Sequence, residues 1–360
     1  MKETRPPGAT SEIVKKLLLA FLAIGALYIA KKFLIPLAIG ALLATLLLPT
    51  CQWMEKKKIP RGVAALSCLV ILILVFAAIT TVLGWQIVEL TNDIAKIKEK
   101  VADLLERAQQ FALSHFGISL KEQSRIIQDQ KNSLAGVLAS LAGSLTSIAT
   151  DLILTTVYIF FLLYYRRHIK NFILQISPPA ERAETEQIVY SATHVSQQYL
   201  LGLSKMIGCL WIMYGIGFSL LGVRNALFFA ILCGLLEIVP FIGNITGTAL
   251  TLLVATVDGA SVGTLIGIAA TYGTVQFIQG WLLEPVILGP QVKINPLFTI
   301  IALVVGELIW GIPGIVLAIP LMAIVKIVCD HIDPLKPYGF LIGALPKEKH
   351  TGTLRKRKDK

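Results

Sequence analysis

Two carboxylates within long apolar stretches are the side chains of this sequence most able to do chemistry. Glu237 lies in the apolar run of residues 226–257, and Glu307 lies in the run of residues 296–328. An ionisable side chain inside a lipid bilayer is costly unless it is paired or hydrated, so both acids are candidates for binding an ion or a polar solute. The alternative is a structural acid that caps free backbone N–H groups at a helix break.

Glycine and proline interrupt both apolar runs beside the acids. Proline lacks an N–H and clashes with the preceding helical turn, whereas glycine permits a tight change of direction. Broken backbone is tolerated at membrane depth only where protein or water covers it. Asn244 lies within the first interruption, and its amide is a third candidate for contacting a solute or ion. The predicted helix-break or gating residues are Pro240, Gly243, Gly247, Gly311, Pro313, Gly314 and Pro320.

The two interrupted runs can be aligned with each other. Sliding one along the other places Glu237 on Glu307 and Leu227-Phe228 on Leu297-Phe298. Composition alone produces some of these matches, but transporter sites often lie at paired broken helices. Each run is too long for one ordinary span, so the alternatives are a long crossing or a hairpin that turns back within the bilayer.

The composition indicates an integral membrane protein. Of the 360 residues, 55% are hydrophobic and 15% are charged, whereas a soluble chain of this length usually needs more polar surface. We expect an all-α, polytopic protein with about eight membrane segments, since a spanning helix needs about 20 apolar residues. The segments that reach or approach this length are residues 13–30, 33–49, 62–88, 148–165, 205–222, 226–257, 260–283 and 296–328.

A polar insertion separates the early membrane segments from the later ones. Apolar residues recur at spacings of three and four from Ile87 to Phe111, and a second apolar stripe runs from Leu134 to Leu145. This periodicity predicts an extramembrane helical hairpin whose seam packs on itself or on a neighbouring subunit. The predicted organisation is a cytoplasmic N-terminus (1–12), first membrane segments (13–87), the insertion (88–147), a span (148–166), a cytoplasmic or interfacial amphipathic helix (167–204), a C-terminal membrane core with broken helices (205–330) and a basic cytoplasmic tail (331–360).

The net charge of +11 is explained by topology rather than by nucleic acid. The basic clusters fall on one side of the membrane if the intervening spans are paired, and the positive-inside rule then places both termini in the cytoplasm. Lys31-Lys32 departs from this pattern. No aromatic-basic module accompanies the charge, so we expect no nucleic-acid partner. The clusters are the N-terminus, Lys56–Lys58 with Arg61, Arg166-Arg167 with Lys170, and the tail from Lys347 to Lys358.

Motifs for enzymatic chemistry are weak. Gly259-Ala-Ser261-Val-Gly263 matches a serine-hydrolase pattern, but no histidine is placed to serve it. Gly259, Gly263 and Gly267 instead repeat every fourth residue, which is typical of close packing between membrane helices. The sequence contains no H-E-x-x-H and no nucleotide-binding loop, and its five histidines and five cysteines form no metal-binding pattern. We therefore expect no enzyme activity, no metal and no cofactor.

The glycine- and proline-rich half of the chain resembles a known family. The residues that carry the resemblance are Pro240–Gly247, Glu284–Gly289 with Asn295–Leu297, and Gly306-Glu307, Trp310-Gly311, Gly314, Ala318–Leu321 and Lys326. They are similar to the autoinducer-2 exporter (PerM-type permease) family of bacterial membrane proteins. The resemblance implies a multi-pass inner-membrane protein with a transport role, associated with export of a quorum-sensing signal and in some members with sodium/proton exchange. Gly202-Leu203-Ser204 and Asn244 depart from the residues that the family often has.

The leading hypothesis is a secondary permease that exports a small signalling or metabolite solute, similar to autoinducer-2, through a site formed by the two broken elements. One alternative is a sodium/proton antiporter that uses Glu237 and Glu307. Another is a non-transporting membrane scaffold that recruits partners through the insertion. The expected partners are the lipid bilayer and a small solute or ion. The seam at 87–111 and the glycines at 259–267 allow a homo-oligomer without requiring one.

Overall fold

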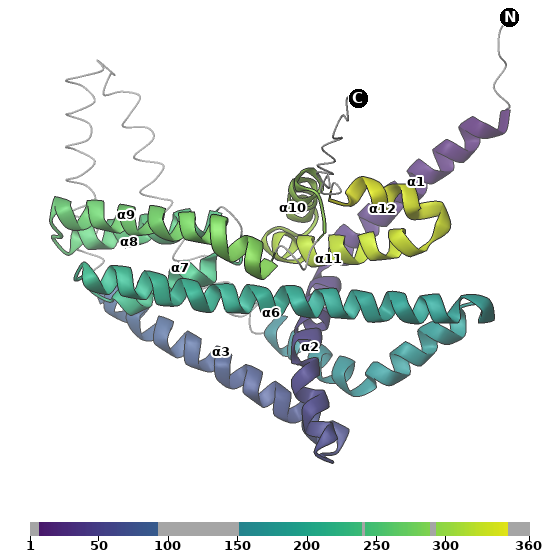
Figure 1. Ribbon diagram of the computed structural model, residues 1–360, viewed down its shortest axis with the longest axis horizontal. Coiled ribbons are helices and arrows are strands. Elements are labelled where there is room, and N and C mark those ends of the chain that lie inside the picture. Colours follow the sequence, from purple (N-terminus) through teal and green to yellow (C-terminus); the bar gives the residue numbers. More distant parts are fainter. Residues whose placement is uncertain (1–6, 93–150, 240–241, 289–292, 345–360) are drawn as a thin grey trace, which may run out of the picture.

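The computed structural model describes residues 7–92, 151–239, 242–288 and 293–344. Helices make up nearly all of these ranges, and the β-structure described in them is an isolated bridge between Ile294 and Gly343. The prediction of an all-α protein is therefore confirmed (Figure 1). The predicted hairpin insertion falls outside the described residues, apart from its first few positions.

Four helices in the described ranges are long and apolar enough to cross a membrane: Lys31–Lys56, Arg61–Gly84, Pro179–Leu220 and Ile312–His331. Other apolar helices are shorter, such as Ala226–Leu236 and Pro296–Trp310. Many large apolar side chains on these helices are exposed, among them Leu74 at 62% and Leu308 at 68%. Lipid is the environment in which such exposure carries no penalty, so the chain is a multi-pass membrane protein. The number of eight segments stays a prediction.

Three N-terminal helices precede the helix of residues 151–176, and the second and third of them pack against it. They are α1 (Pro7–Ile29), α2 (Lys31–Lys56) and α3 (Arg61–Asn92). Small side chains allow close packing where α2, α3 and helix 151–176 meet, since Cys51, Ala64 and Ala65 are completely buried there. Helix 151–176 ends just before Ser177, which precedes Pro178 and Pro179. A residue that precedes proline is disfavoured in the helical conformation, so the helix stops there.

The longest helix, α6 (Arg182–Leu220), follows a short 3₁₀ turn, η1 (Pro179–Glu181). Its 39 residues extend about 58 Å, which is nearly twice the thickness of a bilayer's hydrocarbon core. The predicted segment 167–204 divides between helix 151–176 and α6, and its part from Arg182 onward forms one helix with the span that begins at 205. Figure 1 shows α6 along the middle of the molecule, where it contacts α2 and α11 as well as the helices that follow it in sequence.

The first broken run forms a helical hairpin. Its arms are α7 (Ala226–Leu236) and α8 (Ile242–Val257). The arms pack so closely that a Cβ on Gly247 would lie 2.9 Å from the Cys233 sulfur, and a Cβ on Gly243 would overlap the Leu236 carbonyl. At the open end, Arg224 and Asp258 form an ion pair at 3.8 Å. The chain therefore reverses direction between α7 and α8, which run antiparallel to each other.

After α8 the chain continues through α9 (Val262–Ile278) into a π-helical segment, η2 (Gln279–Leu288). Both pack on α6. The largest buried cluster of the C-terminal half lies between α6, α7, α8 and α9, and its most deeply buried side chains include Tyr214, Phe218 and Ile268. This core fixes the position of the first hairpin against α6 and α9.

The second broken run also forms a hairpin, from α10 (Pro296–Trp310) and α11 (Ile312–His331). Gly311 makes the turn at φ 65° and ψ −143°, a conformation that is nearly restricted to glycine. Gly306 and Gly314 bring the two arms into backbone contact, since a Cβ on either would meet the other's carbonyl oxygen within 2.5 Å. Pro313 occupies the first turn of α11, and Pro320 lies inside this helix, which continues through it.

The open end of the second hairpin is held by the C-terminal elements η3 (Asp333–Leu335) and α12 (Lys336–Ile342). The Asn295 side chain caps α10 by accepting from the Phe298 N–H at 2.9 Å, and its amide donates to the Leu341 carbonyl at 2.7 Å. Asn295 thereby joins the start of the hairpin to α12.

Candidate functional site

Glu237 lies at the end of α7, where the first hairpin turns, and only 7% of it is exposed. The Gln279 amide donates a hydrogen bond of 2.6 Å to Glu237 Oε1. Gln279 is itself 5% exposed and is the first residue of the π-helical segment η2. π-Helical turns are rare and are frequent at functional sites. The acid identified from the sequence is thus held by a buried amide from a different element.

The hydrogen-bonded group continues from Gln279 toward α6. Gln276 Nε2 lies 3.3 Å from Gln279 Oε1 and 3.3 Å from the Tyr214 hydroxyl, and it can donate to both. Tyr214 is completely buried on α6. Polar side chains from α6, α9, η2 and the first hairpin therefore meet inside an otherwise apolar core.

Further polar side chains of α8 surround the hairpin turn. Asn244 is 5% exposed, and its Oδ1 accepts from the Ile245 N–H at 2.7 Å. Thr251 is fully buried and donates to the Gly247 carbonyl at 2.8 Å. Thr248 is also buried, at 5% exposed. The sequence candidates Glu237 and Asn244 are thus both buried at the turn of the first hairpin.

Two oxygens of this group have no hydrogen-bond partner among the described residues: Glu237 Oε2 and Thr248 Oγ1. A buried polar atom without a partner is energetically unfavourable, so such atoms usually mark a place where water, an ion or a ligand binds. A carboxylate oxygen can accept a hydrogen bond from a hydroxyl group, bind a cation or take up a proton. The described residues hold no group of three or more His, Cys, Asp or Glu side chains suited to a metal ion.

Glu307 is in a different environment. It lies in the last turn of α10 before Gly311, which corresponds to the position of Glu237 at the end of α7. Unlike Glu237, it is exposed, and it is not part of the hydrogen-bonded group around Gln279. The two acids therefore lie near the turn of their respective hairpins, but Glu237 is buried and Glu307 is exposed.

The remaining sequence candidates lie at several places. Pro240 falls outside the described residues. Gly259 adopts φ 82° in the turn that follows α8 rather than lying within α9. A Cβ on Gly267 would come within 2.4 Å of Leu221, whereas one on Gly263 would contact only Ser261.

Sequence reasoning did not identify Tyr214, Thr248, Gln276 or Gln279. A signal was present for the two glutamines, which stand three residues apart in an apolar helical segment and so share one face. Tyr214 and Thr248 gave no such signal, because single hydroxyl side chains are common in membrane helices.

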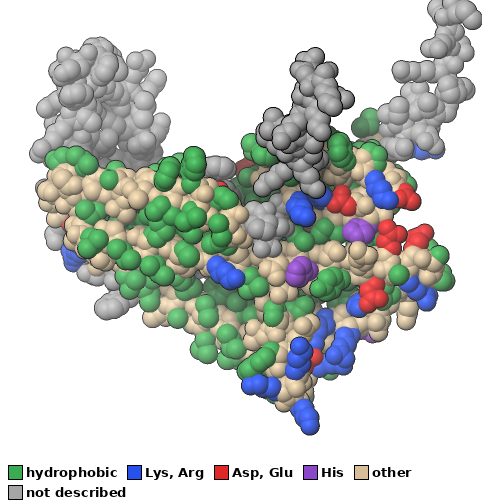
Figure 2. All heavy atoms as spheres, in the orientation of Figure 1, with side chains coloured by type: hydrophobic (Ala, Val, Ile, Leu, Met, Phe, Trp, Pro, Cys, Tyr) green, Lys and Arg blue, Asp and Glu red, His purple; other side chains and the backbone are tan. Residues whose placement is uncertain are grey.

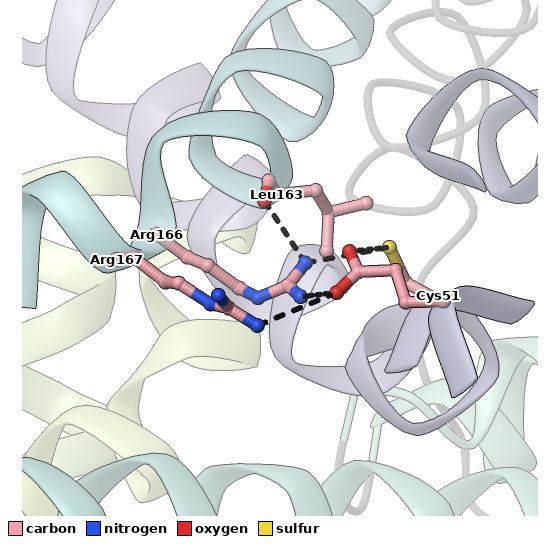
Figure 3. Close-up of polar contacts among 5 residues, drawn as sticks. Cys51, Leu163, Arg166 and Arg167 are labelled. Carbon is pink, nitrogen blue, oxygen red and sulfur yellow. Dashed lines mark hydrogen bonds and ion pairs between the residues drawn. The ribbon is translucent and has the colours of Figure 1, made fainter. Parts of the chain in front are cut away.

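A second polar cluster joins the end of α2 to helix 151–176 (Figure 3). Arg166 donates to the Glu55 carboxylate, to the Leu163 carbonyl at 3.2 Å and to the Cys51 sulfur at 3.5 Å. The Arg166 and Glu55 side chains are 18% and 13% exposed, whereas Arg167 is 62% exposed and lies 3.9 Å from Glu55. This mostly buried pair fixes the two helices to each other.

Replacing Arg166 by glutamine should destabilise the protein by about 3 kcal/mol, because it leaves the Glu55 carboxylate without its main partner. Unfolding of the purified protein in detergent, followed by tryptophan fluorescence, measures the change. Arg167→Gln is the matched control and should cost less than about 1 kcal/mol, since an exposed ion pair contributes little. Equal losses in the two variants would contradict a structural role specific to Arg166.

This chain is similar to known proteins that are named for transport. The profile of the AI-2E family transporter matches residues 17–333. Relatives from several bacteria carry the name "Putative transport protein". YrrI of Bacillus subtilis is 25% identical over 84% of this chain and 87% of its own length. The sll0063 protein of Synechocystis is 28% identical over 86% and 80%, and YhhT of Escherichia coli K12 is 22% identical over 98% and 100%.

Proposed function

Because this chain belongs to the AI-2E family of transporters, we propose that it is a secondary permease that exports a small polar solute of the autoinducer-2 type across the bacterial inner membrane. The relatives named as transport proteins cover most of its length. No nucleotide-binding motif is present in the sequence, so the energy comes from the gradient of the solute or of a coupled ion.

The observation that carries the proposal is the unpartnered carboxylate oxygen of Glu237 at the turn of the first hairpin. An isolated acid in this core is costly unless a ligand, water or proton completes its surroundings. Gln279 holds the other oxygen and so orients the carboxylate. Asn244 and Thr248 supply further hydrogen-bonding atoms from α8, as a hydroxyl-bearing solute requires.

The proposed arrangement has six crossings and two hairpins that enter from opposite sides, which makes eight membrane segments. The crossings are α1, α2, α3, helix 151–176, α6 and α9. The arms α7 and α8, with 11 and 16 residues, reach about 16 and 24 Å, and α10 with 15 residues reaches about 22 Å. These lengths fall short of the ~30 Å hydrocarbon core, whereas α11, with 20 residues, is long enough to cross it and returns to the side from which α10 enters. Both termini and the basic clusters then lie in the cytoplasm.

A flux measurement tests the proposed function. Purified protein in liposomes loaded with autoinducer-2 should release the solute faster than protein-free liposomes prepared in parallel. A protein that incorporates fully but gives no flux, with or without a proton or sodium gradient, would favour the non-transporting scaffold.

The sodium/proton antiporter is the second candidate, because the unpartnered Glu237 oxygen also suits a proton or a sodium ion. A pH-sensitive dye inside the same liposomes separates the two functions. An antiporter changes the internal pH when sodium is added outside in the absence of solute. A solute permease without ion exchange leaves the internal pH unchanged under that condition.

A further inference from the structure

A group of exposed basic side chains lies where α2 ends and α3 begins, beside the middle of helix 151–176. We name it the basic surface: Lys56, Lys57, Lys58, Arg61 and Arg167, all of them exposed. Figure 2 shows basic side chains gathered at this end of the molecule, beyond the region where hydrophobic side chains dominate. These residues come from the turn between α2 and α3 and from the facing turn of helix 151–176.

The basic surface stands on a rigid support. Arg166, which lies beneath it, is bonded to Glu55, Leu163 and Cys51. The start of α3 packs on helix 151–176, since a Cβ on Gly62 would lie 3.6 Å from the Tyr164 ring. Lys58 adopts a left-handed conformation at φ 66°, which closes the turn. The backbone that carries the basic groups is therefore held by packing.

The acid near the basic surface is already engaged. Glu55 is 13% exposed and pairs mainly with the buried Arg166. Arg167 lies 3.9 Å from Glu55 and remains 62% exposed, so most of its guanidinium is available to another anion. Farther along the chain, Lys170 pairs with Glu186 of α6 at 2.6 Å and is not part of the surface. The surface thus carries an excess of positive charge that the described residues do not neutralise.

Aromatic side chains border the basic surface on its apolar side. Trp53 is 56% exposed, and the Lys57 ammonium lies 3.8 Å from the centre of its ring. Tyr164 and Tyr165 are 42% and 46% exposed on helix 151–176. Farther along α3, exposed Val70 and Leu74 are purely apolar. The sequence of apolar, aromatic and basic residues follows the order of hydrocarbon, interface and headgroup in a bilayer.

We propose that the basic surface binds the headgroup of an anionic phospholipid in the leaflet at this end of the helices. The phosphate lies between the α2–α3 turn and Arg167, where a guanidinium fork and ammonium groups meet it from two helices. The acyl chains lie along the exposed apolar faces of α3 and helix 151–176, and Trp53 and Tyr164 lie at the level of the ester groups. Charge complementarity and the adjoining lipid-facing helices favour this ligand over a soluble acidic protein.

Native mass spectrometry of the full-length protein, titrated with phosphatidylglycerol or phosphatidylcholine, tests the proposal. The wild-type protein should bind phosphatidylglycerol more tightly. The variant Lys57→Gln/Lys58→Gln/Arg167→Gln should lose about tenfold in that affinity or more, with phosphatidylcholine binding unchanged. The matched control, Lys31→Gln/Lys32→Gln/Lys205→Gln, removes the same charge elsewhere and should retain the wild-type affinity.

Two outcomes would overturn the proposal: retention of phosphatidylglycerol affinity in the basic-surface variant, or an equal loss in the control. If the basic-surface variant retained its affinity for phosphatidylglycerol, a soluble acidic protein would become the better candidate ligand for the basic surface. A double variant, Lys57→Gln/Arg167→Gln, covers the case in which the Lys58 change disturbs the turn. Its unfolding midpoint should match that of the wild type while its phosphatidylglycerol affinity falls.

Discussion

Glu237→Gln should reduce solute flux in proteoliposomes by at least about tenfold. The substitution keeps the size of the side chain, and the new amide oxygen can still accept from Gln279. It replaces the unpartnered acceptor with a neutral donor, so a ligand hydroxyl or cation loses a charge-assisted interaction. Such an interaction contributes about 1.5–3 kcal/mol, and each 1.4 kcal/mol corresponds to a factor of ten.

The matched control for this experiment is Glu307→Gln. Glu307 occupies the corresponding turn of the second hairpin but is exposed. We expect its replacement to change flux less than twofold. Wild-type flux in the Glu237 variant would show either that the carboxylate works in its neutral form, which glutamine imitates, or that the site is elsewhere. Loss of flux only in the Glu307 variant would move the site to the second hairpin.

Gly314→Ala should strongly destabilise the second hairpin. A Cβ at this position would lie 1.8 Å from the Gly306 carbonyl oxygen, and backbone cannot move aside as a flexible side chain can. The arms α10 and α11 would have to separate, at a cost of about 1–3 kcal/mol or more. The expected result is a lower unfolding midpoint in detergent and less folded protein after purification.

Gly273→Ala is the control for the glycine experiment. Gly273 lies within α9, and a Cβ there would meet nothing within 4 Å among the described residues. Alanine is also the better helix former, so this variant should be as stable as the wild type or slightly more stable. An unchanged unfolding midpoint in Gly314→Ala would contradict the close crossing of α10 and α11.

The amino-acid sequence by itself determined the class of protein. A high apolar content requires a lipid environment, and helical periodicity follows from the backbone. The prediction of an all-α membrane protein of a transporter family depended on such local or summed properties. The candidate turn at Gly311 was also accessible, because the freedom of glycine at positive φ belongs to its own backbone.

The partners of the candidate acids were decided only by the tertiary structure. Glu237 and Glu307 look equivalent in sequence, yet one is buried beside Gln279 and the other is exposed. Likewise, Glu55 and Arg166 are far apart in sequence and meet where α2 packs on helix 151–176. Burial and hydrogen-bond partners depend on which helix faces pack together, and that packing is a property of the whole chain. The sequence therefore named candidate acids, and the fold decided that Glu237 is buried and Glu307 is exposed.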